Sequence, residues 1–141
     1  GRSRDQLTVD LFVTMSVRDG EASAVDDIRA WATSQAATFH PWKRMPPAWE
    51  RFRPDFARAA DAYHLVDHLS LQARHKAIVT DEFAKSVALA GDLETCVEGL
   101  RKLWQLDIDR ITFALLSGGR MQRLAHLSDT VIGAVEATGA G

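Results

Sequence analysis

The residues best suited to bind a ligand form a glycine turn late in the chain. The turn comprises Ser117, Gly118, Gly119 and Arg120, and it follows an apolar run and precedes an amphipathic segment. At the carboxyl end of a strand, the backbone N–H groups of such a turn, together with the guanidinium of Arg120, can bind a phosphate or another anion. The motif is short, so an ordinary strand-to-helix turn is the alternative interpretation.

Arg18 holds an equivalent position near the beginning of the chain. It follows the first apolar run and lies between Ser16 and Asp19. Ligands of open α/β sheets and of α/β barrels bind at the carboxyl ends of the strands. Arg18 is therefore a second candidate for ligand binding, with a structural turn again as the alternative.

A basic and aromatic patch follows the first predicted helix. Its members are His40, Trp42, Lys43 and Arg44, in a connection that contains Pro41 and ends at two further prolines. These side chains could contact a substrate or part of a cofactor. A solvent-exposed loop with one packed tryptophan is the simpler interpretation.

The histidines do not form a recognisable metal motif. His64 and His68 have the i, i+4 spacing of one helix face, with Asp61 one turn before, and His75 follows later. The sequence contains no His-Glu-x-x-His motif and no third ligand at a diagnostic spacing. We therefore predict no metal site.

Composition limits the class of partner. The chain has 141 residues and a net charge of −2, and its basic residues do not cluster. We therefore expect neither nucleic acid nor a membrane as a partner. Cys96 is the only cysteine; this excludes an internal disulfide and is typical of a cytoplasmic protein. No apolar run is long enough to span a bilayer.

Hydrophobic periodicity predicts an α/β protein. We expect a strand over residues 7–17, a helical insertion over 21–78, helices over 80–105, a strand over 110–116 and a closing helix over 120–136. Within the insertion, residues 49 to about 75 are predicted to be helical, with a kink near Arg53 because Pro54 removes a backbone donor. Around Leu89, a helix is favoured over a strand.

A capped helix is expected after Gly91. Asp92 is a suitable N-cap residue, and Leu93, Val97, Leu100 and Trp104 recur on one helical face. We expect this face, with Phe113 of the following strand, to pack in the core.

The two predicted strands are apolar on both faces, so each needs neighbours on either side. A pair of such strands does not satisfy its own edges. The chain is therefore expected to be part of a larger α/β domain and to begin within the fold.

Several segments also follow a known order and spacing. They are GRSRD at residues 1–5 before the strand LTVDLFVTMSV, DEF at 81–83, ALAGDLETCV at 88–97, DIDRI at 107–111 and FALL at 113–116. In this order they resemble the luciferase-like monooxygenase family, which includes coenzyme F420-dependent and FMN-dependent oxidoreductases. Asp92 and Leu93 stand where the family usually has Thr-Pro, and Asp107 stands where glycine is usual.

The resemblance implies that residues 1–141 are the C-terminal part of a single (β/α)8 TIM-barrel domain, comprising strands seven and eight, a helical insertion and the closing helix. It implies a flavin-type cofactor, FMN or coenzyme F420, which exchanges hydride with a small-molecule substrate in the barrel mouth. It places most of the site in earlier strands, so the catalytic residues are not assigned here. Ser117 to Arg120 and Arg18 are the cofactor-binding candidates, and the patch at residues 40–44 could contact an F420 tail.

The resemblance also implies a homo-oligomer or association with the rest of the barrel. The alternative is a non-catalytic α/β interaction module that needs a partner chain to complete its fold.

Overall fold

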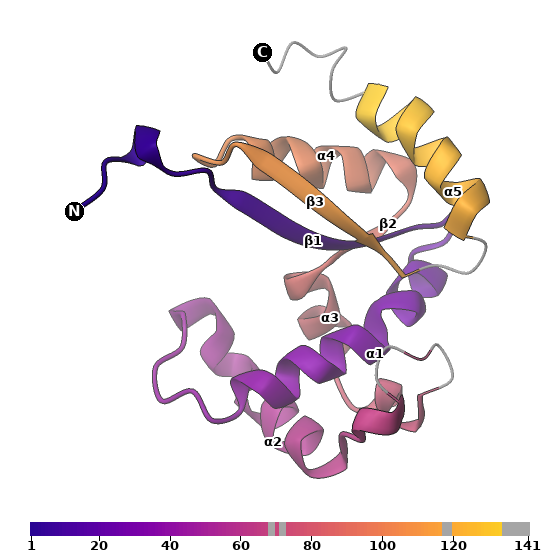
Figure 1. Ribbon diagram of the computed structural model, residues 1–141. Helices are drawn as coiled ribbons and strands as arrows, with labels where there is room; N and C mark the ends of the chain where they lie inside the picture. Colours follow the sequence, from indigo (N-terminus) through magenta and orange to yellow (C-terminus); the bar gives the residue numbers. More distant parts are fainter. Residues whose placement is uncertain (68–69, 71–72, 117–119, 134–141) are drawn as a thin grey trace.

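The computed structural model describes residues 1–67, 70, 73–116 and 120–133. A parallel sheet lies between helices, which confirms the predicted α/β class (Figure 1). The strands are β1 (Asp10–Val17), β2 (Leu89–Gly91) and β3 (Arg110–Leu115). The α-helices are α1 (Glu21–Phe39), α2 (Arg53–Ala62), α3 (Asp81–Val87), α4 (Leu93–Trp104) and α5 (Arg120–His126). Short 3-10 helices span Arg4–Gln6, Pro47–Phe52, Leu65–Asp67 and Arg74–Ala77, and a π-helical segment, Leu127–Ile132, follows α5.

β1 is the central strand of the sheet. The strand order is β2-β1-β3, and both neighbours run parallel to β1. β3 pairs along β1 from Asp10 to Met15, whereas β2 pairs only with residues 15–17. Both predicted strands are therefore confirmed as adjacent strands. Within the described part of the chain the sheet is open, with β2 and β3 at its edges.

The helix predicted around Leu89 is wrong, because Leu89–Gly91 forms strand β2. Its three residues are too few for periodicity to distinguish the two structures. Pairing with β1 decides between them: Arg18 N donates to Gly91 O at 2.9 Å, extending the ladder beyond the paired residues.

The helical segment predicted from Trp49 to about His75, with a kink near Arg53, is continuously helical only as far as Ala62. The segment begins as a 3-10 helix that continues into α2 at Arg53, where Pro54 lies in the first turn. Proline is favoured there because its missing N–H would have no helical partner. α2 ends at Ala62, since Tyr63 is extended with φ −71° and ψ 128°.

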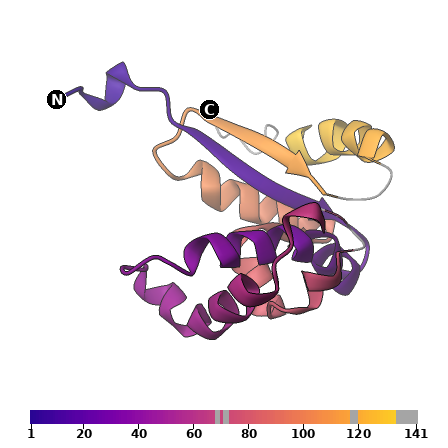
Figure 2. The same ribbon diagram turned by 60° about the horizontal axis from the view of Figure 1, so that its bottom comes forward.

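The two faces of the sheet have different cores. On one face α4 packs on β1 and β3 through the sheet cluster, defined as Met15, Cys96, Val97, Leu100 and Leu127. On the other face α1, α2 and α3 form the helical cluster (Figures 1 and 2). Its members are Ala24, Val25, Ile28, Ala32, Ala36, Phe52, Phe56, Ala59, Val79, Phe83, Ala84, Ala88 and Ala90.

The prediction for α4 is correct except at its last residue. Asp92 caps the helix by accepting a hydrogen bond from Thr95 N at 2.8 Å. Hydrogen bonds from the side chain and from the backbone of Thr95 lower the pKa of Asp92. Val97 and Leu100 are buried, but Trp104 is 40% exposed. Trp104 ends the helix, so it lacks a following turn that would cover it. Phe113 packs against the sheet cluster as expected.

Candidate functional site

A buried polar network lies at the carboxyl end of β1. Arg18 donates to both carboxylate oxygens of Asp27, from Nε at 2.7 Å and from Nη2 at 3.0 Å. Ser16 Oγ donates to Asp27 Oδ2 at 2.7 Å. Ser16 and Asp27 are buried, at 0% and 8% exposed. The network therefore joins β1 to α1 at the edge of the sheet where ligands of α/β folds bind.

The ion pair between Arg18 and Asp27 fixes the position of the Arg18 guanidinium. The hydrogen bond with Asp27 is the main cause of its raised pKa, so the arginine is always charged. A two-point contact between guanidinium and carboxylate also fixes orientation. Arg18 therefore has a clear structural role, and its contact with a cofactor stays a prediction.

A hollow of about 400 Å³ adjoins this network and is lined by Arg18, Ala22, Ser23, Asp26 and Asp27. Both carboxylates already have cationic partners, Asp27 with Arg18 and Asp26 with Lys76 Nζ at 2.8 Å. A bound anion would compete with these carboxylates for the same cations. The hollow is therefore better suited to a neutral polar group than to a phosphate.

The glycine turn is the other predicted site. Ser117, Gly118 and Gly119 lie outside the described residues, and Arg120 is the first residue of α5. The proposed contact of these four residues with a cofactor stays a prediction. The turn does follow β3, on the same carboxyl edge as Arg18, because β1 and β3 are parallel.

A second polar feature lies on the sheet face opposite α4. Thr14 is 1% exposed, and its hydroxyl has no hydrogen-bond partner among the described residues. Two residues earlier on the same face, Phe12 is 61% exposed. Beside Thr14 in the register, on β3, is the small and half-buried Ala114. The sheet face thus combines an open aromatic surface with a buried hydroxyl.

This face is only partly covered by helices. α1 begins near the carboxyl end of β1 and runs away from the sheet toward α2 (Figure 1). It covers Ala90 and the network at Ser16. Toward the amino end, Asp10, Phe12 and Thr112 are exposed. There the Thr112 hydroxyl donates to both carboxylate oxygens of Asp10, at 2.9 and 3.0 Å.

The basic and aromatic patch matches the exposed-loop interpretation. Residues 40–44 are all exposed. Trp42 packs its ring 4.9 Å from that of Phe39 and remains 47% exposed. The patch follows the carboxyl end of α1, whereas the carboxyl edge of the sheet lies at the beginning of that helix (Figure 1). Its contact with a ligand stays a prediction.

The residues that the structure describes contain no group of three side chains able to hold a metal ion. His64 is exposed, whereas His75 is buried with its ring 4.9 Å from that of Tyr63. His68 lies outside the described residues. Burial raises the pKa of the Cys96 thiol to about 11, so at neutral pH this cysteine is a protonated, buried hydrophobic group.

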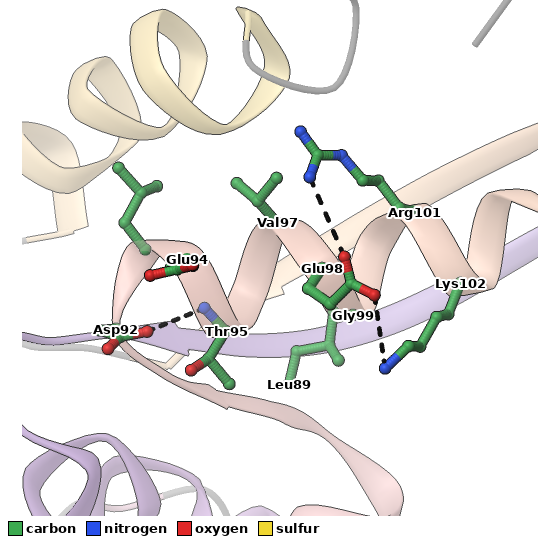
Figure 3. A pocket seen from close by; sticks show the side chains of 10 residues that line it. Leu89, Asp92, Glu94, Thr95, Val97, Glu98, Gly99, Arg101 and Lys102 are labelled. Carbon is green, nitrogen blue, oxygen red and sulfur yellow. Dashed lines mark hydrogen bonds and ion pairs between the residues drawn. The ribbon is translucent and has the colours of Figure 1, made fainter. Parts of the chain in front are cut away.

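An open groove runs along α4 on the outside of the sheet (Figure 3). Its charged side chains pair within the helix, because Glu98 contacts Lys102 at 3.5 Å and Arg101 at 3.9 Å. Gly99 lies against Leu89 of β2, where a Cβ atom would come within 2.6 Å of Leu89 Cδ2. The groove thus reflects close packing of α4 on β2, and Glu98 pairs with both of the cations that line it.

Asp27 and Thr14 are the residues that the sequence did not identify as part of a site. Asp27 interrupts the apolar positions of α1, directly before Ile28, and a carboxylate at a buried helix position needs a partner. That signal could have indicated a pairing with Arg18. Thr14 gave no signal, because a threonine is common in any strand.

The comparisons with known proteins add no identification. No family model matches the sequence, and neither a curated protein nor a solved structure matches the chain. Within the described residues, none of the helices is both long and apolar enough to cross a bilayer. The functional assignment therefore rests on the sequence resemblance and on the geometry above.

Proposed function

We propose that this chain forms part of a flavin- or F420-dependent oxidoreductase of the luciferase-like type, with its sheet in the wall of a (β/α)8 barrel. The observation that carries the proposal is the arrangement of β1 and β3. They are adjacent and parallel, α4 covers one face, and the opposite face is open toward its amino end. A barrel wall also has adjacent parallel strands with helices on the outer face and side chains pointing inward. The structure departs from that pattern where α1 covers Ala90 and Ser16 on the opposite face and where β2 pairs with the other side of β1.

Two unpaired strand edges support a larger sheet. β2 pairs with only the last residues of β1, and no further strand among the described residues pairs with β3. Large apolar side chains are also exposed at the end of α4, in its following loop and on the helices after β3: Trp104, Leu106, Met121, Leu124 and Ile132. Further strand–helix units in the complete protein would bury them.

The sheet face fits a planar cofactor ring. Phe12 offers an exposed aromatic surface on this face, whereas Thr14 on the same face is buried. FMN or F420 would supply hydride transfer to a small-molecule substrate. This chain would supply part of the floor of the cofactor site, while Asp27 holds Arg18 at the carboxyl edge.

A titration of the complete, cofactor-free protein with FMN and with F420, followed by fluorescence, tests the proposal. We expect saturable binding of one of the two. Phe12→Ser should weaken that binding roughly two- to tenfold, as expected for loss of one aromatic contact. Leu65→Ser is the matched control, because Leu65 is 77% exposed in the helical insertion, and it should leave the affinity unchanged.

The second candidate function is a non-catalytic module that binds a partner chain through its open sheet. The exposed Phe12 and the unpaired strand edges favour it equally. If the complete protein binds neither FMN nor F420, the oxidoreductase proposal is wrong and this alternative replaces it.

A further inference from the structure

The hollow at the carboxyl end of β1 contains a guanidinium with unused hydrogen-bond donors. Arg18 lines this hollow of about 400 Å³, and Asp27 holds its side chain through Nε and Nη2. No other described residue accepts a hydrogen bond from the Arg18 side chain. A guanidinium carries five N–H donors in a rigid fork, so the donors that Asp27 does not use have a fixed direction and remain for a ligand.

Asp26 supplies an acceptor in the same hollow. Its Oδ2 accepts from Lys76 Nζ at 2.8 Å, and no described residue donates to its Oδ1. Its side chain is 53% exposed, and it lines the hollow together with Arg18. The hollow therefore offers a fixed donor group and a carboxylate acceptor, and each of the two already has a partner of opposite charge.

The charges of the lining select the class of ligand. Arg18 and Asp27 form one ion pair, and Asp26 and Lys76 form another, so the four side chains carry no net charge. An anion would be repelled by the two carboxylates, and a cation by the guanidinium and the ammonium group. A neutral group that both accepts and donates can use the remaining donors and the remaining acceptor at once. Two adjacent hydroxyl groups have this property, and in dinucleotide-binding folds a carboxylate binds a ribose hydroxyl in this way.

We infer that the hollow binds the adjacent hydroxyl groups of a neutral polyol or sugar. One hydroxyl oxygen accepts from Arg18, and a neighbouring hydroxyl donates to Asp26. Asp27 is a positioning residue: it is itself held by Ser16 Oγ at 2.7 Å, and it fixes the direction of the Arg18 guanidinium. The inference goes beyond the proposed function and does not depend on it, because it requires no flavin-type cofactor.

Ligand-detected NMR, by saturation transfer from the complete protein, tests the inference. The probe is erythritol, which has a hydroxyl on each carbon. The matched control compound is the butanediol with hydroxyls only at the two ends of the same chain. We expect transfer to erythritol and none to the butanediol, and an excess of inorganic phosphate should not displace erythritol. Absence of transfer to erythritol, equal transfer to both compounds, or displacement by phosphate would each overturn the inference.

Two substitutions on α1 locate the binding. Asp26→Ala removes the acceptor and should weaken erythritol binding by about tenfold, as for loss of a hydrogen bond to a charged group. Glu21→Ala is the matched control, because it also removes a carboxylate that pairs with a lysine, Lys85 Nζ at 2.6 Å, but Glu21 does not line the hollow. It should leave the affinity unchanged. Equal affinities of the two variants for erythritol would overturn the inference, whereas binding of FMN or F420, measured separately, decides the proposed function.

Discussion

The helical side of the molecule contains a core of buried aromatic rings, whereas the sheet side leaves the ring of Phe12 exposed. In the helical cluster the rings of Phe52 and Phe56 each lie 5.3 Å from that of Phe83, with edge-to-face geometry. All three are at most 3% exposed. The sheet cluster contains no fully buried aromatic ring, and its strands leave Phe12 on the surface at 61% exposed.

This difference separates a part of the chain whose aromatic rings are buried from a part that leaves large apolar side chains in solvent. The edge-to-face contacts of Phe52, Phe56 and Phe83 stabilise the packing of α2 and α3 against α1. On the sheet side Phe12, Trp104 and Leu106 are exposed, and exposed apolar surface is a candidate for an interface or a binding site. The helical side is therefore the stabilising part of the chain, and the sheet side carries the candidate site.

The largest expected effect is the loss of a ring from the helical cluster. Phe83→Ala should lower the free energy of unfolding by about 3–5 kcal/mol, because it leaves a cavity between Phe52 and Phe56. Trp104→Ala is the control from the sheet side and should cost less than Phe83→Ala, because Trp104 is already 40% exposed whereas Phe83 is fully buried. Urea denaturation measures both changes.

Similar losses for Phe83→Ala and Trp104→Ala would contradict the comparison. That result would mean that Trp104 is buried in solution, as it would be if neighbouring chain covered the sheet side. Measuring both variants in the isolated chain and in the complete protein shows whether neighbouring chain buries Trp104.

The next largest expected effect on stability concerns Asp27, which links β1 to α1. Asp27→Asn removes the charge that accepts hydrogen bonds from Ser16 and Arg18 and should cost about 1–3 kcal/mol. Asp26→Asn is the neighbouring control. Its partner Lys76 lies near the surface, and exposed ion pairs contribute less than about 1 kcal/mol. Equal costs in urea denaturation would show that the Ser16–Asp27–Arg18 network does not join β1 to α1.

The sequence predicts those parts of the fold that local chemistry decides. β1 and β3 follow from long apolar runs, and α4 follows from the Asp92 cap and the spacing of Val97 and Leu100. β2 could not be predicted, because its three residues become a strand only by pairing with β1. The end of α2 at Ala62 is likewise set by the extended Tyr63, for which no proline or glycine gives a signal.

The candidate site shows the same limit. Arg18 and the glycine turn were recognisable because turn residues after apolar runs have a local signature. The partner of Arg18 was not, because Asp27 is brought to it by the return of α1 across the end of β1. The orphaned hydroxyl of Thr14 is a property of packing alone, and no sequence pattern indicates it.

The smallest expected effect tests how closely α4 packs on the sheet. In an open helix interior, Gly→Ala stabilises a protein by about 0.5–1 kcal/mol. At Gly99 the new methyl group would meet Leu89 Cδ2 at 2.6 Å, so Leu89 must change position and we expect this gain to be absent. In a Leu89→Ala background the obstacle is removed, and the same Gly99→Ala substitution should recover the gain. Urea denaturation of the four proteins in this double-mutant cycle measures the coupling between the two positions. If Gly99→Ala already raises the free energy of unfolding by about 1 kcal/mol with Leu89 present, the close contact between Gly99 and Leu89 is wrong. α4 would then lie farther from β2, and the sheet side would be more loosely packed than the helical side.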